Sequence, residues 1–330
     1  MSEYVIRYAI EKDIPLIKKY IDENWKKNHI LVTKDGLFEW QYTSDKLDYV
    51  IGIDKDGQIQ GMLGFISYSN DTHRDIATSM WKANSGTGFL GIKLLMFVKN
   101  NEKHRVLFSP GINIKTSGGI YKRMGIATGK MNQWYRLNDK SEYIVANIKN
   151  KNIPKYSIRQ CKNIIKYDSY EKFVKDFDHE KYVNKGVVPY KSLEYIKRRY
   201  FEHPVYDYLK FGVVENGETK AVFIVRIQPC NKTKVLRFVD CIGDYSVLGS
   251  VTEFLDHLLD EIDAEYIDMY EKGISVEMLI RAGWTNLEET QNIIPNYFSP
   301  YEQRNIDIYY CTTTEDIVLF RGDGDQDRPN

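Results

Sequence analysis

A near-repeat of turn and helix signals is the feature that most restricts what this chain can fold into. In the first half, an Asp56-Gly57 turn between apolar runs is followed 68 residues later (57 to 125) by Gly125, behind a helical segment. In the second half, Asn216-Gly217 is followed 66 residues later (217 to 283) by Gly283, again behind a helical segment. Asp-Gly and Asn-Gly turns favour antiparallel hairpins, and glycine favours helix C-termini. The spacing therefore indicates a tandem duplication of one domain type.

The first half has the pattern of an antiparallel sheet followed by alternating helices and strands. Alternating apolar residues predict strands, and apolar residues three and four apart predict helices with one buried face. We expect strands at Val5–Ile10, Tyr49–Asp54, Ile59–Tyr68, Ile76–Ala83, Arg105–Phe108 and Lys130–Leu137, and helices at Asp13–Trp25, Leu37–Tyr42, Ile92–Asn100 and Thr116–Met124. The strand at Lys130–Leu137 is expected to close the sheet.

The second half repeats this order. Tyr156–Phe177 resembles the opening strand and helix, and the later elements are expected at Phe211–Val214, Ala221–Ile227, Val235–Cys241, Val251–Ile262, Tyr266–Met269 and Val276–Ala282. Lys, Asn and Pro interrupt the hydrophobic pattern at Asn147–Pro154. We therefore predict an α/β (α+β) protein of two domains, 1–150 and 151–330, each with a mixed, mostly antiparallel sheet flanked by helices.

Charge and composition exclude several classes of partner. Lys plus Arg and Asp plus Glu number 46 each, so the chain has no net field to hold a nucleic acid. The longest apolar runs are strand-sized, and the N-terminus lacks a signal-peptide pattern, so we expect a cytoplasmic protein without a membrane partner. The four cysteines are far apart without a Cys-x-x-Cys pair, which predicts neither a disulfide framework nor a metal site.

A glycine-rich turn precedes the predicted helix at Ile92–Asn100. Ser85-Gly86-Thr87-Gly88-Phe89-Leu90-Gly91 matches Gly-x-Gly-x-x-Gly, but antiparallel strands precede it, and Ser109-Pro110-Gly111 rather than an acidic residue follows the next strand. A dinucleotide-binding fold has neither property. Converging backbone N–H groups and the helix dipole still favour an anion here, and Lys82 lies close in sequence. The alternative is a glycine corner needed only for chain reversal.

The first half, from Val5 to Leu137, resembles the GNAT superfamily of acyl-coenzyme A transferases. The resemblance rests on the antiparallel entry sheet, the glycine-rich turn, and Asn113 followed by Ile120-Tyr121-Lys122-Arg123-Met124-Gly125. It implies that acyl-coenzyme A is the co-substrate and that Tyr121 protonates the leaving thiolate; the alternative is a tyrosine that packs a helix. The cofactor-binding residues that it implies are Trp81, Lys82, Ser85, Gly86, Thr87, Gly88, Phe89, Asn113 and Tyr121.

Amine attack on a thioester also needs a proton acceptor, and the sequence does not single one out. The candidates are His29, Glu39, His73 and Glu102, of which we place His29 and Glu39 in the predicted site. A chain of water molecules to bulk solvent is an alternative. Each of these side chains can equally be an ordinary polar residue of the surface.

Aromatic and basic residues suggest where an acceptor binds. Trp40, Tyr42 and Trp134 are predicted to stack on it, although core packing is the competing explanation. In the second half, Arg199, His203 and Tyr206 combine a guanidinium with stacking groups, as a nucleotide diphosphate requires. A solvated basic helix face explains the same residues equally well.

The whole chain resembles tandem-GNAT proteins of bacterial surface-polysaccharide clusters, including the segment from Tyr200 to Tyr206 and the terminal Gly322–Asn330. The family named by this resemblance comprises nucleotide-sugar N-acyltransferases acting on dTDP-3-amino-3,6-dideoxyhexoses, with acetyl or 3-hydroxybutanoyl as the acyl group. It implies a nucleotide-linked amino sugar as partner of a monomer or small homo-oligomer. The alternatives are a tRNA-dependent aminoacyl transferase of the peptidoglycan-bridge type and a non-catalytic GNAT-like binding protein.

The end of the chain alternates Asp323, Asp325 and Asp327. This pattern suggests a calcium loop, but it has no glycine at the sixth position and no room for a glutamate at the twelfth. We expect either a solvated acidic end or a segment docked by Arg321 and Arg328.

Overall fold

The computed structural model describes residues 4–184 and 186–328, and its contacts divide the chain into two compact units. The first unit runs up to Thr128 and also contains Tyr310–Glu315 and the residues from Gly324 onward. The second unit contains Gly129–Tyr309 and Asp316–Asp323. This division differs from the predicted boundary at residue 150, because strand β7 (Asn132–Leu137) pairs with β12 (Ala264–Lys272) in the second sheet.

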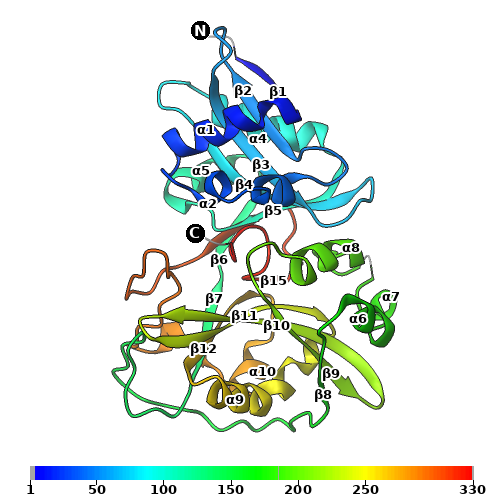
Figure 1. Ribbon diagram of the computed structural model, residues 1–330, viewed down its shortest axis with the longest axis vertical. Helices are drawn as coiled ribbons and strands as arrows, with labels where there is room; N and C mark the ends of the chain where they lie inside the picture. Colours follow the sequence, from blue (N-terminus) through cyan, green and yellow to red (C-terminus); the bar gives the residue numbers. More distant parts are fainter. Residues whose placement is uncertain (1–3, 185, 329–330) are drawn as a thin grey trace. The chain divides into compact units, whose positions relative to one another are not determined.

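The first unit is a mixed sheet with helices on both faces (Figure 1). Its strands lie in the order β1-β2-β3-β4-β5-β14-β6. Strands β4 and β5 run parallel, whereas β1 and β2, β2 and β3, β3 and β4, and β5 and β14 pair antiparallel. The elements are β1 (Val5–Tyr8), α1 (Ile14–Asn24), α2 (Ile30–Thr33), α3 (Leu37–Tyr42), β2 (Tyr49–Ile53), β3 (Ile59–Ser67), β4 (Arg74–Ala83), α4 (Leu90–Asn101), β5 (His104–Pro110), α5 (Ile114–Arg123), β6 (Ala127–Lys130) and β14 (Tyr309–Thr312).

Two glycines of β3 show which helices cover which face. A Cβ added to Gly61 would lie 2.9 Å from Leu94 of α4, whereas a Cβ added to Gly64 would lie 2.7 Å from Tyr42 of α3. Residues 61 and 64 of one strand point to opposite faces. Helices α4 and α3 therefore cover opposite faces of the sheet, and each approaches the backbone because β3 has no side chain there.

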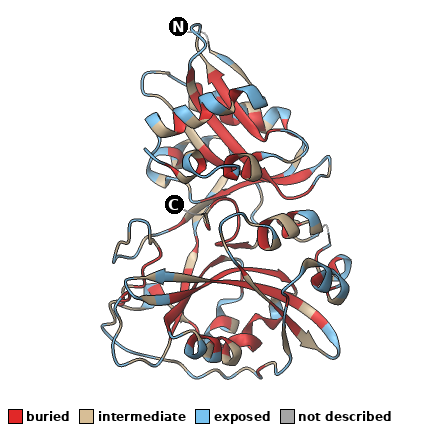
Figure 2. Ribbon diagram, viewed as in Figure 1, coloured by how far each residue is buried: buried red, intermediate tan, exposed pale blue. Residues whose placement is uncertain are grey.

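The core of the first unit lies between the sheet and helices α4 and α5. Leu90, Leu94, Leu95 and Val98 of α4 and Tyr121 of α5 pack against apolar residues of β2, β3, β4 and β5. Complete burial of a leucine contributes about 2 kcal/mol. Figure 2 shows the central strands of the sheet largely in red, the colour of buried residues. The predicted spacing of apolar residues along α4 is thus explained by their packing against the sheet.

The second unit repeats the central part of this arrangement. In the first unit β3 and β4 are antiparallel and α4 connects β4 to the parallel β5; in the second, β10 and β11 are antiparallel and α9 connects β11 to the parallel β12. The elements are β8 (Ile164–Lys166), α6 (Tyr170–Asp176), α7 (His179–Tyr182), α8 (Leu193–Ile196), a π-helix (Lys197–Phe201), β9 (Leu209–Glu215), β10 (Glu218–Cys230), β11 (Thr233–Gly243), α9 (Thr252–Glu261), α10 (Val276–Arg281), β13 (Thr285–Asn286) and β15 (Leu319–Phe320), with β7 and β12. The predicted fold of two mixed, mostly antiparallel sheets flanked by helices is confirmed.

The predicted closure of the first sheet by Lys130–Leu137 is wrong. Strand β7 lies between β13 and β12 of the second sheet, with Trp134 opposite Met269. The first sheet is instead extended by β14, where Cys311 lies opposite Ser109 of β5. Alternation along a strand shows which side chains are buried, but not which sheet the strand joins, so the sequence could not assign either strand.

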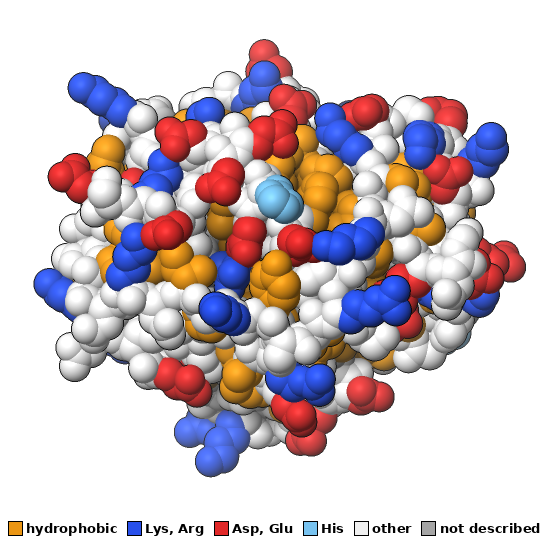
Figure 3. All heavy atoms as spheres, turned by 90° about the horizontal axis from the view of Figure 1, so that it is seen from below, with side chains coloured by type: hydrophobic (Ala, Val, Ile, Leu, Met, Phe, Trp, Pro, Cys, Tyr) orange, Lys and Arg blue, Asp and Glu red, His pale blue; other side chains and the backbone are white. Residues whose placement is uncertain are grey.

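The charged side chains are distributed without a dominant sign on the face that Figure 3 presents. Lys and Arg are interspersed there with Asp and Glu, and hydrophobic side chains show between them (Figure 3).

In the described part of the chain, every helix is too short or too polar to cross a bilayer.

Candidate functional site

Strands β4 and β5 separate partway along their length. Their parallel pairing runs from Arg74 opposite His104 to Ala77 opposite Phe108. Beyond this point β5 pairs with β14 on its other side, and the hydroxyl of Ser109 donates to the carbonyl of Thr78 at 2.6 Å. The backbone of β4 from Ser79 to Ala83 is thus left without a strand partner on the β5 side.

A β-bulge lies in the free part of β4. Gly61 and Met62 of β3 pair with Ala83 and Lys82, but Gly64 pairs with Ser79, so Met80 and Trp81 together face Leu63. Met80 has φ +49°, a conformation that non-glycine residues rarely adopt. A bulge of this kind turns backbone groups out of the ladder and re-aims side chains. It therefore offers peptide groups to a ligand between β4 and β5.

A hollow of about 280 Å³ opens where the two strands part. Residues from β4, from β5 and its following turn, from α5, and from the last residues of the chain line it. They are Trp25, Thr78, Ser79, Met80, Trp81, Ser109, Pro110, Gly111, Ile112, Asn113, Thr116, Ser117, Tyr121, Asp325, Gln326 and Arg328. Of the predicted site residues, the structure brings Trp81, Asn113 and Tyr121 together here.

Tyr121 lies on α5 at the wall of this hollow and is 2% exposed. Its ring lies 5.6 Å from that of Trp81. Burial raises the pKa of Tyr121 far above its usual range, and the neighbouring Cys311 adds to the rise. The hydroxyl therefore keeps its proton at neutral pH and can act only as a donor or neutral acceptor.

The glycine-rich turn lies at the N-terminus of α4, a 12-residue helix. Gly86 and Gly88 have φ of +81° and +63°, and a Cβ at either position would meet no atom within 4 Å. The turn is therefore open toward solvent, with Ser85 and Phe89 also exposed and Thr87 and Lys82 half-buried. An open turn of left-handed glycines before a helix has the form of an anion site.

Two hydrogen bonds connect this turn to its surroundings. The indole N–H of Trp81 donates to the carbonyl of Gly91 at 2.9 Å, which joins the bulge of β4 to the first turn of α4. The hydroxyl of Tyr20 donates to the side-chain oxygen of Asn84 at 2.8 Å, just before the turn. The hollow and the glycine-rich turn are therefore held together by Trp81.

Asn113 caps helix α5. Its side-chain oxygen accepts a hydrogen bond from the backbone N–H of Thr116 at 3.4 Å, and the residue is exposed. The capping role explains an asparagine at this position without a ligand. Its side chain nevertheless belongs to the lining of the hollow, so the two roles are compatible.

The predicted proton acceptors His29 and Glu39 do not line the hollow. Burial lowers the pKa of His29 to about 4, and Arg328 and Lys26 contribute to this shift. Glu39 receives a hydrogen bond from Lys18 at 2.9 Å, and this bond lowers its pKa although burial opposes the change. Their position outside the hollow separates both groups from the predicted site.

The predicted aromatic residues are divided between the site and the cores. Tyr42 is buried and its hydroxyl lies 3.0 Å from that of Ser79, so it supports the wall of the hollow from behind. Trp40, in the same helix α3, is half-buried outside the hollow. Trp134 is completely buried in the second unit, where its indole donates to Glu271 at 2.9 Å. The predicted stacking role of Trp134 is therefore corrected to a core role.

In the second unit, two of the residues predicted to bind the acyl acceptor lie together. The His203 and Tyr206 rings are stacked 5.2 Å apart, and the guanidinium of Arg226 lies 3.9 Å from the centre of the Tyr206 ring. Arg199 is buried and donates to the carbonyl of Gly322 at 3.4 Å. We call His203, Tyr206 and Arg226 the aromatic-arginine cluster; the sequence identified its two rings but not Arg226, which comes from β10.

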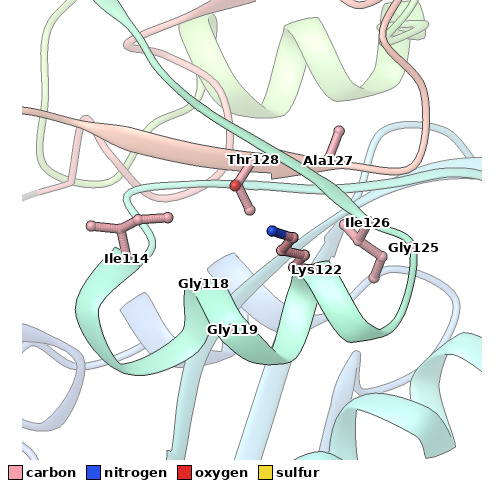
Figure 4. Close-up of a pocket in the computed structure, with 8 residues that line it drawn as sticks. All are labelled: Ile114, Gly118, Gly119, Lys122, Gly125, Ile126, Ala127 and Thr128. Carbon is pink, nitrogen blue, oxygen red and sulfur yellow. The ribbon is translucent and has the colours of Figure 1, made fainter.

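A second, more open hollow of about 520 Å³ lies along α5 (Figure 4). Gly118 and Gly119 leave the helix surface bare, and the Lys122 side chain extends toward the strand segment that carries Ala127 and Thr128. Ser117 and Tyr121 face the first hollow, so α5 borders a hollow on two of its sides.

Among the described residues, no group of three or more His, Cys, Asp or Glu side chains is arranged to hold a metal ion. The acidic end of the chain is also not solvated. Asp323, Asp325 and Asp327 are 0%, 8% and 2% exposed. Arg328 pairs with Asp325, and Arg321 donates to Asp268 at 2.6 Å, so the docked alternative is the correct one.

The fold is that of the GCN5-related N-acetyltransferases. A GCN5-related N-acetyltransferase from Anabaena variabilis superposes with a TM-score of 0.57 at 6% identity, over 94% of this chain and 72% of its own. A candidate acetyltransferase from Pyrococcus horikoshii gives 0.50 at 11% identity over 95% and 91%. A conserved protein from Enterococcus faecalis, described as a probable N-acyltransferase, gives 0.54 at 8% identity over 96% and 74%. No protein-family model and no curated protein matches the sequence.

Three residues that line the hollow, from the last part of the chain, were not predicted from the sequence to do so. Asp325, Gln326 and Arg328 lie more than 200 residues after the strands whose gap they help to line. The alternating aspartates and the flanking arginines are visible in the sequence, but they do not indicate that this segment packs at the end of β5. Ser79 and Ser109 were not singled out as individual site residues, because single serines in strands carry no sequence signal.

Proposed function

We propose that the first unit binds acyl-coenzyme A and transfers its acyl group to an amine. The observation that carries this proposal is the hollow between the parted strands β4 and β5, with Tyr121 in its wall and with Trp81 joining it to the first turn of α4 behind the glycine-rich turn. A long thin thioester arm fits between two strands that offer unpaired peptide groups. A diphosphate fits an open turn before a helix. The shared fold with N-acetyltransferases supports the same conclusion.

The residues of the first unit then have distinct tasks. Ser85 to Phe89 and Lys82 would hold the diphosphate, and the bulge at Met80 would offer backbone N–H groups to the thioester carbonyl. Tyr121 would donate its proton to the departing sulfur, because burial keeps this hydroxyl protonated.

We propose further that the acceptor is the amino group of a dTDP-linked 3-amino-3,6-dideoxy sugar and that the acyl group is 3-hydroxybutanoyl or acetyl. The proposal follows from the resemblance described for the sequence, which rests on the segment from Tyr200 to Tyr206 and on the terminal Gly322–Asn330. The aromatic-arginine cluster supports it too, because stacked rings and a guanidinium suit a base and a diphosphate. The balanced charge of the chain, with 46 Lys and Arg and 46 Asp and Glu, gives no support to a tRNA as the acyl donor.

The test is thiol release from acetyl- and 3-hydroxybutanoyl-coenzyme A by the full chain, with a panel of dTDP- and UDP-linked amino sugars as acceptors. We expect release with at least one dTDP-3-amino sugar, and mass spectrometry should find the added acyl group on the sugar nitrogen. Release only with UDP-sugars would overturn the proposed acceptor. No release with any amine would overturn the proposed activity.

A double substitution of Gly86 and Gly88 by alanine should weaken coenzyme A binding about 10-fold or more. Alanine disfavours the positive φ of both positions, so the turn is expected to change conformation and lose converging N–H groups. Calorimetric titration with coenzyme A measures the effect. Gly57→Ala is the matched control, because Gly57 also has a positive φ of +76° with nothing within 4 Å and lies in another turn of the same unit. Equal affinities in the two variants would exclude this turn as the diphosphate site.

A further inference from the structure

The last described residues of the chain are fixed to the end of strand β5. The backbone N–H of Gly324 donates to the hydroxyl of Tyr68 at 2.7 Å, and the side-chain amide of Gln326 donates to the carbonyl of Pro110 at 3.2 Å. Gly111, which has φ +80°, leaves room for this contact; a Cβ there would lie only 1.8 Å from Gln326. We call Gly324–Arg328 the terminal segment. Tyr68 and Pro110, to which it is attached, both belong to the first unit.

The terminal segment supplies the carboxylate of the hollow. Of the described residues that line it, Asp325 is the one with a carboxyl group, and neither histidine nor glutamate is among them. Asp325 is 8% exposed, and the guanidinium of Arg328 pairs with it. The same guanidinium lies 3.4 Å from the sulfur of Met80, at the bulge of β4. Asp325 is therefore held in place next to the segment of β4 where the thioester carbonyl is proposed to lie.

The other candidate bases are less suited to this task. His29, Glu39, His73 and Glu102 all lie outside the lining of the hollow, whereas Asp325 belongs to it. A general base must come within hydrogen-bond reach of the proton that it removes, and geometry precedes pKa in this choice.

We infer that Asp325 is the catalytic residue that takes the proton from the attacking amine, and that Arg328 is a positioning residue for it. This inference rests on the proposed function. The amine nitrogen forms the new C–N bond as its proton passes to the Asp325 carboxylate, and the C–S bond breaks as the Tyr121 proton passes to sulfur. The products are an amide and a free thiol, and solvent then carries the proton from Asp325 back to Tyr121. The terminal segment thus completes the site of the first unit.

The test compares the full-length wild type with Asp325→Asn, Asp325→Glu and Asp325→Ala, using 3-hydroxybutanoyl-coenzyme A and dTDP-3-amino-3,6-dideoxygalactose. Loss of general base catalysis should lower kcat by about 100-fold or more in Asp325→Asn, with the Kd of coenzyme A unchanged. Asp325→Glu should recover part of kcat. Added acetate or formate should restore turnover of Asp325→Ala saturably, which a merely structural role would not produce. Asp316→Asn, an exposed aspartate of the same C-terminal region, is the matched control.

A second variant tests the placement of the segment without changing a charge. Gly111→Ala should displace Gln326 and lower kcat as Asp325→Asn does, whereas Gly217→Ala, with φ +81° and nothing within 4 Å, should leave kcat near the wild-type value. Wild-type kcat in Asp325→Asn would overturn the assignment. Loss of kcat in Asp325→Ala without any rescue by carboxylates, together with weaker coenzyme A binding, would show a structural role instead. A wild type that acylates no amine would refute the proposed function, and the assignment would fall with it.

Discussion

Tyr121→Phe is expected to lower the kcat of acyl transfer by about 100-fold, which is the usual size of a lost general acid. The phenylalanine removes the proton donor from the wall of the hollow but keeps the ring that packs against Trp81. Burial keeps the wild-type hydroxyl protonated, so the loss should be similar between pH 6 and pH 9. Steady-state kinetics over this pH range, with calorimetric titration of coenzyme A, measure the two effects separately. The Kd of coenzyme A should not change.

Tyr49→Phe is the control for this substitution. Tyr49 is also a buried tyrosine of the first unit, and its hydroxyl donates to the sulfur of Met62 at 3.2 Å, outside the lining of the hollow. We expect its kcat to stay near that of the wild type. If Tyr121→Phe and Tyr49→Phe have equal rates, the sulfur receives its proton from another group, and Tyr121 is a packing residue of α5.

Lys191→Met is expected to destabilise the second unit by about 3–5 kcal/mol, because it leaves buried carboxylates without their cation. The Lys191 ammonium lies 2.6 Å from Asp240 and 3.0 Å from Asp323, and all three groups are buried. The hydroxyl of Tyr200 also donates to Asp240, at 2.5 Å. Methionine keeps the length of the side chain, so packing changes little. Unfolding in urea, followed by tryptophan fluorescence, measures the loss.

The destabilisation by Lys191→Met should be larger at pH 8 than at pH 5. Burial raises the pKa of Asp240 above its usual range; Lys191 opposes this rise and Asp323 adds to it. When the folded-state pKa of a carboxyl lies above its unfolded value of 3.8, the free energy of unfolding of the protein falls as the pH rises from the lower of these two values to the higher. Removing Lys191 raises the folded-state pKa further and extends the interval upward. The exposed Lys181→Met, which breaks an ion pair with Glu218, should change stability little at either pH. Equal losses in the two variants would show that the buried charges are not coupled.

The glycine-rich turn could be predicted from sequence because local chemistry specifies it, and Tyr121 because its segment resembles a motif of the GNAT superfamily. Positive φ at Gly86 and Gly88 requires glycine, and a glycine-rich turn before an apolar helix is visible in a short window. Tyr121 was found through a short motif on one helix. Trp134 and His29 show the limit of this reasoning. The sequence indicates an aromatic ring or an imidazole, but the surroundings decide whether it is buried in a core or faces a ligand.

By itself the sequence determined the element types, the duplicated arrangement and the glycine-rich turn, because hydrophobic period and turn chemistry act over a few residues. Only the tertiary structure decided that β7 joins the second sheet, that β14 extends the first, and that Asp325 lines the hollow near Tyr121. Strand pairing and the docking of a chain end depend on contacts between residues far apart along the chain. Such contacts are selected by the packing of the whole domain, and no local pattern of residues encodes them.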